Sequence, residues 1–383
     1  MTKKSDAPAI RFKGFSDAWE QRKLGDIASD MVAGGDIDKD LILAEGQYPV
    51  IANALTGDGI VGYYDKEYRV NAPAVTVTGR GDVGHAKARL VNFTPVVRLL
   101  SVKSEHDVFF LENAINTLKI VIESTGVPQL TVPQLAKYEV AFPRQLDEEE
   151  HIGAFFKQLD HLITLHQRKF EKLTNVKKSM LEKMFPQNGS SYPEIRFKGF
   201  TDPWEQRKLG EIGSVSMCRR IFKEQTSETG DIPFYKIGKF GADPDAFISR
   251  ELFEEYKSKY PYPQKGDILI SASGSIGRTV EFAGNNEYFQ DSNIVWLNHD
   301  ERLSNPFLKC FYSVVKWAGI EGSTIKRLYN DNILNTVICM PSVPEQKRIG
   351  LFFENLDNLI TLHQRELEKL QNIKKSMLEK MFV

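Results

Sequence analysis

Apolar side chains return at seven-residue intervals in two long segments, 152–185 and 349–382. Sustained heptads predict long helices that pair as a coiled coil, and the obvious partners are the two segments themselves. The polar residues His166 and His363 interrupt the stripe at equivalent places, and we interpret them as residues that fix the helix register rather than as a pH switch or a metal pair. The positions expected to form the seam are Leu159, Ile163, His166, Leu173, Met180, Leu356, Ile360, His363, Leu370 and Met377.

The remainder of the chain contains two stretches, roughly 28–145 and 213–343, in which short apolar runs alternate with turn residues. β-Branched and aromatic runs of this length predict strands. They are Tyr48–Ile51, Ala74–Thr78 and Val96–Leu100 in the first stretch, and Pro233–Ile237, Asp267–Ile270 and Asn293–Leu297 in the second. Helical patterns lie near 248–258 and 305–319, so each stretch is expected to fold as a mixed α/β domain.

An internal duplication organises the whole chain. Residues 8–27 and 193–212 are identical at 16 of 20 positions, at an offset of 185. The two helical segments agree at 26 of 34 positions, at an offset of 197, so the second variable stretch is 12 residues longer than the first. Two near-identical frames around two unlike inserts indicate one scaffold that presents two different surfaces for recognition.

Composition changes this picture little. The net charge is −1, from 50 basic and 51 acidic residues, which argues against a protein that simply coats DNA but leaves room for local basic surface. The three cysteines are widely spaced and match neither a zinc pattern nor a disulfide framework. Because we find neither a signal peptide nor an apolar run long enough for a membrane span, we expect a reduced cytoplasmic compartment.

Strings that resemble catalytic motifs favour structural explanations. Gly79–Gly84 fits the dinucleotide pattern G-x-G-x-x-G, but residues 85–91 alternate like a strand where a Rossmann fingerprint needs a helix, so a glycine hairpin is expected. An acidic-acidic-lysine pattern at 244–257 resembles a nuclease signature, yet 249–256 has the pattern of an amphipathic helix with solvated charges. We find no phosphate-binding loop for ATP and no Asn-Pro-Pro-aromatic methyltransferase motif, and we expect no catalytic residue and no metal site.

The repeated boxes resemble those of a known family, the specificity subunits of type I restriction-modification enzymes. The residues that carry the resemblance are the FKGF…WEQRKLG boxes at 12–25 and 197–210 and the Leu-Asp-x-Leu-Ile-Thr-Leu-His-Gln-Arg runs at 159–168 and 356–365. A further carrier is the Pro-x-x-Pro-Glu-Gln-Lys-Arg-Ile start of the second helix at 341–349. The first helix departs from this pattern, because 143–151 lacks the second proline and the Glu-Gln pair.

The resemblance implies an α+β fold with two mixed α/β target-recognition domains separated by two long helices, which form an antiparallel coiled coil with pseudo-two-fold symmetry. Each domain would read one half of a bipartite DNA target. The implied partners are double-stranded DNA, two methyltransferase subunits and, optionally, two restriction-translocase subunits, in a bacterial cytoplasm. This chain would then be non-catalytic and bind no cofactor, and S-adenosylmethionine, ATP and Mg²⁺ would belong to the partner subunits.

The repeats also set the expected domain boundaries. Residues 1–145 form the first recognition domain with its box at 8–27, and 146–185 form the first spacer helix. A linker at 186–192 follows. Residues 193–343 form the second recognition domain with its box at 193–212, and 344–383 form the second spacer helix.

The side chains expected to contact DNA are polar and basic residues of the unlike stretches, because arginine can read guanine, and glutamine or asparagine can read adenine. They are Arg80, Lys87, Arg89, Gln129, Thr131, Arg219, Arg220, Ser275, Arg278, Gln290, Asn293, Lys326 and Arg327. Any one of them could instead contact a phosphate or be plain surface. Two other functions stay open at this point: a duplicated coiled-coil adaptor that binds protein partners, and a single-chain restriction enzyme, which the missing catalytic motifs disfavour.

Overall fold

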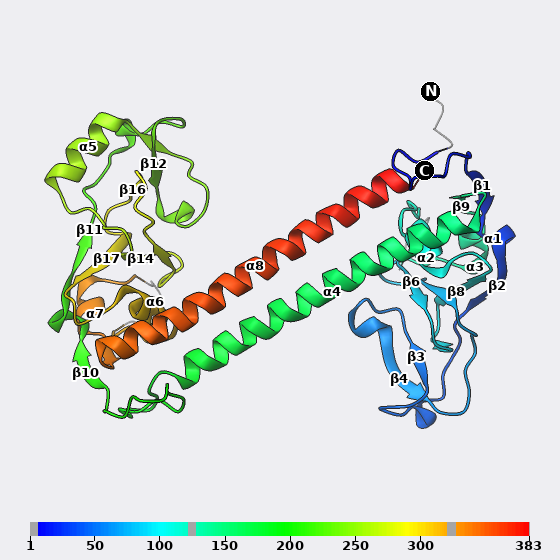
Figure 1. Ribbon diagram of the computed structural model, residues 1–383, viewed down its shortest axis with the longest axis horizontal. Coiled ribbons are helices and arrows are strands. Elements are labelled where there is room, and N and C mark those ends of the chain that lie inside the picture. Colours follow the sequence, from blue (N-terminus) through cyan, green and yellow to red (C-terminus); the bar gives the residue numbers. More distant parts are fainter. Residues whose placement is uncertain (1–6, 122–127, 320–326, 383) are drawn as a thin grey trace. The chain divides into compact units, whose positions relative to one another are not determined.

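The computed structural model describes residues 7–121, 128–319 and 327–382 (Figure 1). The chain divides into two compact units. Unit 1 comprises Met1–Arg168 and Gln364–Val383, and unit 2 comprises Lys169–His363. The division falls within the two long helices, α4 (Leu146–Lys183) and α8 (Val343–Met381), so each helix contributes one part to each unit. No helix in the described part of the chain has an apolar stretch of the length that a bilayer crossing requires.

Unit 1 is built on a four-stranded sheet of order β2-β8-β5-β6 and a three-stranded sheet of order β4-β3-β7. The larger sheet is antiparallel throughout, and β3 and β7 of the smaller sheet run parallel. A separate pair, β1-β9, joins the beginning of the domain to its end. The strands are β1 (Glu20–Lys23), β2 (Ala28–Ala33), β3 (Tyr48–Ile51), β4 (Ile60–Tyr64), β5 (Ala74–Thr78), β6 (Ala86–Arg89), β7 (Thr94–Pro95), β8 (Leu99–Ser104) and β9 (Glu139–Phe142). The short helices are α1 (Leu24–Ile27), η1 (Lys39–Leu41), η2 (Thr56–Gly59), α2 (Val108–Asn116) and α3 (Val132–Leu135).

Unit 2 repeats this plan. Its four-stranded sheet has the order β11-β17-β14-β15, its three-stranded sheet has the order β13-β12-β16, and β10-β18 is the separate pair. The strands are β10 (Glu205–Lys208), β11 (Gly213–Met217), β12 (Ile232–Tyr235), β13 (Phe247–Ile248), β14 (Ile268–Ser271), β15 (Thr279–Glu281), β16 (Tyr288–Phe289), β17 (Ile294–His299) and β18 (Val337–Met340). The short helices are η3 (Leu209–Glu211), η4 (Lys223–Gln225), η5 (Ile237–Lys239), α5 (Arg250–Lys259), α6 (Asn305–Val314) and α7 (Asn330–Asn335).

The additional length of the second variable stretch appears here as α5. Between β4 and β5 of unit 1, residues 65–73 contain no helix, whereas α5 lies between β13 and β14 of unit 2. Ser249 caps α5 by accepting a hydrogen bond from the Leu252 backbone N–H. Phe253 of the helix is buried in one of the hydrophobic cores of unit 2. The sequence-based prediction of an amphipathic helix at this place is confirmed.

A tryptophan of the repeated box joins the sheet-containing part of each unit to the end of a long helix. The Trp19 ring centre lies 5.7 Å from that of Phe110 in α2 and 6.3 Å from that of Phe382, directly after α8. Edge-to-face packing of buried rings stabilises such a junction beyond the area that it buries. Unit 2 repeats the cluster with the equivalent three rings, Trp204, Phe307 and Phe185.

Within each unit the two long helices pack antiparallel. In unit 1, Asp160 of α4 accepts a hydrogen bond from Lys374 of α8 at 2.5 Å, while Phe156 packs on Phe382 at 5.8 Å, so residue numbers rise along one helix as they fall along the other. In unit 2, Lys177 of α4 donates to Asp357 of α8 at 2.5 Å. Asp160 and Lys374 become Asp357 and Lys177 when the two copies of the helix are exchanged, so each unit contains the image of the other unit's ion pair.

The seam residues lie at the protected side of the helices. All ten of the seam residues that we named from the sequence are buried or half-buried, whereas Leu162, Leu165, Leu359 and Leu362 stand exposed beside them. The same two leucine positions are therefore exposed in both copies of the helix.

The start of each long helix is tied to the repeated box by a buried ion pair. Arg11 donates two hydrogen bonds of 2.7 Å to Glu148 in the first turn of α4, and Arg196 does the same to Glu345 in the first turn of α8. Both carboxylates are only 1% exposed. A bidentate pair of this geometry fixes direction as well as distance, so the box holds the angle at which the chain enters the helix.

The predicted strands are confirmed at Tyr48–Ile51 and Ala74–Thr78, whereas the strand predicted at Pro233–Ile237 ends at Tyr235, where the chain turns into η5. The strand predicted at Val96–Leu100 begins only at Leu99. Arg98 adopts a left-handed backbone with φ of 72°, which a strand does not accommodate, and the Val96 N–H donates to the carbonyl of Ile51 instead. In unit 2 the helix predicted over 305–319 ends at Val314.

Candidate nucleic-acid interface

A glycine-containing hairpin loop projects from the larger sheet of each unit. In unit 1 it joins β5 to β6, and the Thr78 hydroxyl donates to the Asp82 carbonyl at 2.6 Å and accepts from the His85 N–H at 2.9 Å. In unit 2 the loop joins β14 to β15, and Ser271 makes the equivalent contacts to Ser275 and Arg278. A strand rather than a helix follows Gly84, so the predicted hairpin is confirmed.

Three segments of unit 1 that are distant in sequence meet at this loop. The Gly79 N–H donates to the Asn53 side chain, and the Gly79 carbonyl accepts from the Leu130 N–H. Arg80 and Gln129 consequently face each other in a β-bridge. A Cβ at Gly79 would lie 2.1 Å from the carbonyl oxygen of Arg98, so the turn before β8 also touches the loop.

Unit 2 brings together the equivalent segments. The Ala272 N–H donates to the Asn293 carbonyl, and the Leu328 N–H donates to the Ala272 carbonyl. The side chains of this junction bond to one another, because the Ser273 hydroxyl donates to Asn293 and the Arg327 guanidinium donates to Ser292. Four residues that the sequence singled out as DNA contacts, Ser275, Asn293, Arg278 and Arg327, therefore lie on one junction of loop and turn.

The turn that precedes the last strand of the larger sheet is strained in both units. Arg98 before β8 has φ of 72°, and Ser292 before β17 has φ of 49°. Left-handed backbone at residues other than glycine persists only where the surroundings hold it, and it is common at binding sites. Sequence reasoning missed Arg98 because nothing in its local sequence signals a left-handed arginine. Its place next to the predicted Arg80 appears only in the fold.

Three of the predicted DNA contacts have structural tasks. Arg89 donates to the Thr76 hydroxyl at 3.0 Å and to the Asp58 carbonyl at 2.9 Å, and its burial lowers the pKa of the guanidinium. Thr131 caps α3, with both its N–H and its hydroxyl donating to Gln134. The Gln290 side chain accepts from the Ile237 N–H at 2.8 Å. These groups are less able to meet a base than the exposed candidates are.

The exposed candidates are distributed over both units. Arg80 and Lys87 are exposed in unit 1, as are Arg219 and Arg220 in unit 2. Arg220 donates from Nε to Asp291 at 2.8 Å, which leaves its terminal nitrogens to point elsewhere. Arg278 is exposed and donates to the Gly241 carbonyl. Lys326 lies outside the described residues.

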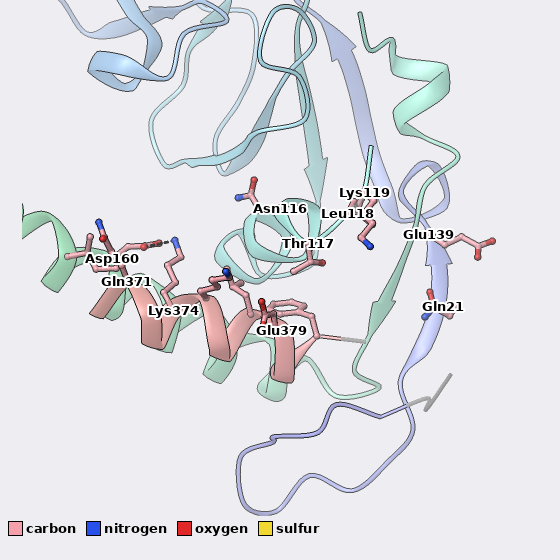
Figure 2. Close-up of a pocket in the computed structure, with 14 residues that line it drawn as sticks. Gln21, Asn116, Thr117, Leu118, Lys119, Glu139, Asp160, Gln371, Lys374 and Glu379 are labelled. Carbon is pink, nitrogen blue, oxygen red and sulfur yellow. Dashed lines mark hydrogen bonds and ion pairs between the residues drawn. The ribbon is translucent and has the colours of Figure 1, made fainter. Parts of the chain in front are cut away.

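Unit 1 also contains a cavity of about 910 Å³ between the end of α2 and the long helices (Figure 2). Its walls carry both signs of charge, and Lys374 is already bonded to Asp160 there. A second cavity, of about 480 Å³, adjoins it and includes Glu112, whose carboxyl has a raised pKa because it is buried. The described residues contain no group of three or more His, Cys, Asp or Glu side chains that could hold a metal ion.

Comparison with known proteins gives consistent matches. The family model for the type I restriction modification DNA specificity domain matches residues 16–175 and 201–372. Each matched span begins inside one repeated box and ends inside one long helix, so the family's unit occurs twice. A putative type I restriction enzyme specificity subunit of Haemophilus influenzae is 60% identical over 158 residues, which are 40% of this chain and 41% of that protein.

Two further relatives match nearly the full length. The MjaVIII specificity subunit of Methanocaldococcus jannaschii is 22% identical over 396 residues, which cover 94% of this chain and 91% of that protein. The crystal structure of a type I restriction-modification S subunit from M. genitalium is similar with a TM-score of 0.71 at 17% identity, over 98% of this chain and 99% of that one. At this identity the structural likeness shows a shared fold.

Proposed function

Because the chain belongs to the type I restriction modification DNA specificity family, we propose that it is the specificity subunit of such a system and that its two units read the two halves of a split DNA target. The observation that carries the proposal is the repeated junction of hairpin loop and strained turn. One of its backbone bonds recurs in both units: the Leu130 N–H donates to the Gly79 carbonyl as the Leu328 N–H donates to the Ala272 carbonyl. Its exposed side chains differ, as they must if the two units read different bases.

The proposed domains follow the repeats. Residues 1–145 and 193–343 are the two recognition domains, 146–185 and 344–383 are the spacer helices, and 186–192 is the linker. Strand pairs β1-β9 and β10-β18 close the two domains at equivalent places, beside the starts of α4 and α8. The spacer helices would then set the distance between the two half-sites.

The base-reading side chains that the structure favours surround the two junctions. In unit 1 they are Arg80 and Gln129, and in unit 2 they are Ser275, Asn293 and Arg327. Arg220 joins them, because a carboxylate that holds the Nε of an arginine leaves a flat edge of two nitrogens for guanine. Lys87, Arg278 and Lys326 are assigned to phosphates, while Arg89, Thr131 and Gln290 support the surface from within.

The partners of the chain are expected to be two methyltransferase subunits and, optionally, two restriction subunits. The duplicated helices support this number, since the exposed leucines of α4 recur at the equivalent positions of α8. A repeated apolar surface fits two copies of one partner better than two unlike partners. S-adenosylmethionine, ATP and Mg²⁺ would be bound by these partners, and the whole complex would work in the bacterial cytoplasm.

Coexpression with the cognate methyltransferase tests the proposal. Genome-wide mapping of methylated adenines should give one bipartite motif. Replacement of residues 28–145 by the corresponding segment of another family member should change one half of the motif and leave the other half as it was. A change in both halves, or in neither, would rule out the reading of one half-site by each unit.

A further inference from the structure

Unit 2 has a cavity of about 470 Å³ next to the C-terminal end of the additional helix α5. It lies between the end of β11 and the residues that follow α5, and its floor contains the buried Cys218. The walls combine cationic and aromatic side chains: Arg219, Arg220, Phe222 and Tyr260. Phe222 is 51% exposed and Tyr260 38% exposed, so both rings are open to contact from outside.

The two arginines of this cavity are held in different ways. The guanidinium carbon of Arg219 lies 5.2 Å from the centre of the Tyr260 ring. A guanidinium stacked on an aromatic face keeps all its N–H groups at the edge, where they can meet a phosphate. Arg220 is oriented by a charged partner instead, through its 2.8 Å bond to Asp291.

The cavity continues directly into the proposed reading surface. Asp291 lines the cavity, and the next residue, Ser292, accepts hydrogen bonds from Arg327. Arg219, Arg220 and Arg327 are therefore linked by neighbouring contacts, which run from Tyr260 through Asp291 to Ser292. If Arg327 contacts a base in the groove of the DNA, the sugar-phosphate backbone of the same DNA would pass close to Arg219.

Unit 1 differs at the equivalent place. Met217 pairs with Val295 in unit 2 as Ala33 pairs with Leu100 in unit 1. The two units can therefore be aligned at the ends of β11 and β2. The chain continues as Cys218, Arg219, Arg220 in unit 2 but as Gly34, Gly35, Asp36 in unit 1. Two cations of this segment in unit 2 thus correspond to a glycine and an acid in unit 1, where Arg69 from a different segment donates to the Asp36 carbonyl.

From this geometry we infer that Arg219, stacked on Tyr260, is a clamp for a DNA phosphate beside the half-site that unit 2 reads, and that unit 1 has no equivalent contact on this segment. The inference rests on the proposed DNA-reading function. A phosphate contact carries no sequence information, so the clamp adds affinity on one side of the target without narrowing the recognised sequence.

The test uses the complex with the methyltransferase and a duplex that contains the mapped target. Arg219→Ala should make the negative slope of log K against log salt concentration shallower by about 0.9, and it should weaken binding on the order of eight-fold at 0.1 M salt. The methylated motif should not change. Tyr260→Ala keeps the charge and should weaken binding by about two- to five-fold. Lys259→Ala is the matched control, because this exposed lysine of α5 is paired with Glu255 on its own helix.

Three results would overturn the inference. Binding and slope that are unchanged in Arg219→Ala would show that the arginine does not meet DNA. An altered methylated motif would make Arg219 a base reader, and lost methyltransferase assembly with normal DNA affinity would make the cavity a protein contact. If the native complex itself methylates no defined sequence, the proposed function fails. If it methylates a defined motif and Arg219→Ala behaves like Lys259→Ala, only the clamp fails.

Discussion

Gly79 lies at the point where three segments of unit 1 cross. A Cβ at this position would lie 2.1 Å from the carbonyl oxygen of Arg98 and 3.0 Å from that of Leu130, and both obstacles are backbone atoms that cannot rotate away. Its backbone φ is not in the left-handed region, so the requirement for glycine is one of space alone. Unit 2 has Ala272 here, which shows that the two crossings differ in spacing although the bond from the Leu130 N–H to the Gly79 carbonyl recurs from the Leu328 N–H to the Ala272 carbonyl.

Gly79→Ala is therefore expected to lower the free energy of unfolding by about 1 to 3 kcal/mol, because the crossing must open to admit a methyl group. It should also loosen the recognition of the first half-site, since Arg80 and Gln129 are carried by the same crossing. Gly238→Ala is the control, because a Cβ there meets nothing within 4 Å. Urea unfolding of both variants measures the difference, and equal costs for the two would contradict the steric argument.

For single residues, the sequence predicted which segments carry the candidate DNA contacts but not which side chains are free to contact DNA and which hold the fold together. Residues such as Arg80, Asn293 and Arg327 are polar, flank turns and lie in the unlike stretches, and those features are visible in the sequence. Arg89 looked like an equal candidate, yet its hydrogen bonds go to Thr76 and to the Asp58 carbonyl. A tether to residues 13 and 31 positions away depends on tertiary packing, which a local pattern does not encode.

The elements that were easiest to predict are the long helices, and the least predictable feature is how each begins. The heptad pattern encodes a helix over many turns, so small local preferences average out. The first turn depends on single residues. In unit 2 the buried Gln346 side chain accepts from the Ser304 N–H and donates to two carbonyls, those of Arg302 and Pro341.

Unit 1 has a histidine and a carboxylate at the equivalent places. Glu149 takes the place of Gln346, and it accepts from His106 at 2.9 Å and from the Asp107 N–H at 3.3 Å. His106 stands where unit 2 has the apolar Leu303. The departure from the family pattern in the first helix is thus accompanied by a second change 43 residues earlier, which the sequence did not reveal.

We expect the effects of substituting His106 and Glu149 on the free energy of unfolding to depend strongly on each other. His106→Leu should cost about 3 to 5 kcal/mol of unfolding free energy, because it leaves the fully buried Glu149 carboxylate without its partner. The double variant with Glu149→Gln should regain most of that loss, since it reproduces the Leu303–Gln346 arrangement. Urea unfolding of the two single variants and the double variant gives the coupling energy. Losses that simply add would show that the two residues act independently.

For the whole molecule, the duplication was the strongest prediction that the sequence offered. It follows from identity at fixed offsets, which needs no knowledge of packing. The structure adds that the repeated residues contact one another in matching ways in each unit. Arg11 binds Glu148 as Arg196 binds Glu345, and the ion pair of Asp160 with Lys374 recurs as that of Asp357 with Lys177. The scaffold is therefore interchangeable at these contacts, whereas Glu149 and Gln346 differ.

That interchangeability predicts a chain with two copies of the first recognition domain. Its joints lie after Lys208 and before Val337, which pair with each other as Lys23 pairs with Glu139. Residues 24–138 would replace residues 209–336, and Gln346→Glu would be added so that the grafted histidine meets a carboxylate. The helix residues that receive the domain are already the same, since Leu181, Met184 and Phe185 in unit 2 correspond to Leu378, Met381 and Phe382 in unit 1.

The chimera should assemble with the methyltransferase and methylate an inverted repeat, with both halves equal to the half-site read by unit 1. An inverted repeat is expected because the two helices pair antiparallel in each unit, so exchanging the two copies of the helix reproduces the same pairing. The same chain without Gln346→Glu is the matched control, and it should be less stable by the cost of its unmatched histidine. A folded, assembled chimera that still methylates the original two-part motif would show that recognition is not confined to the unlike segments.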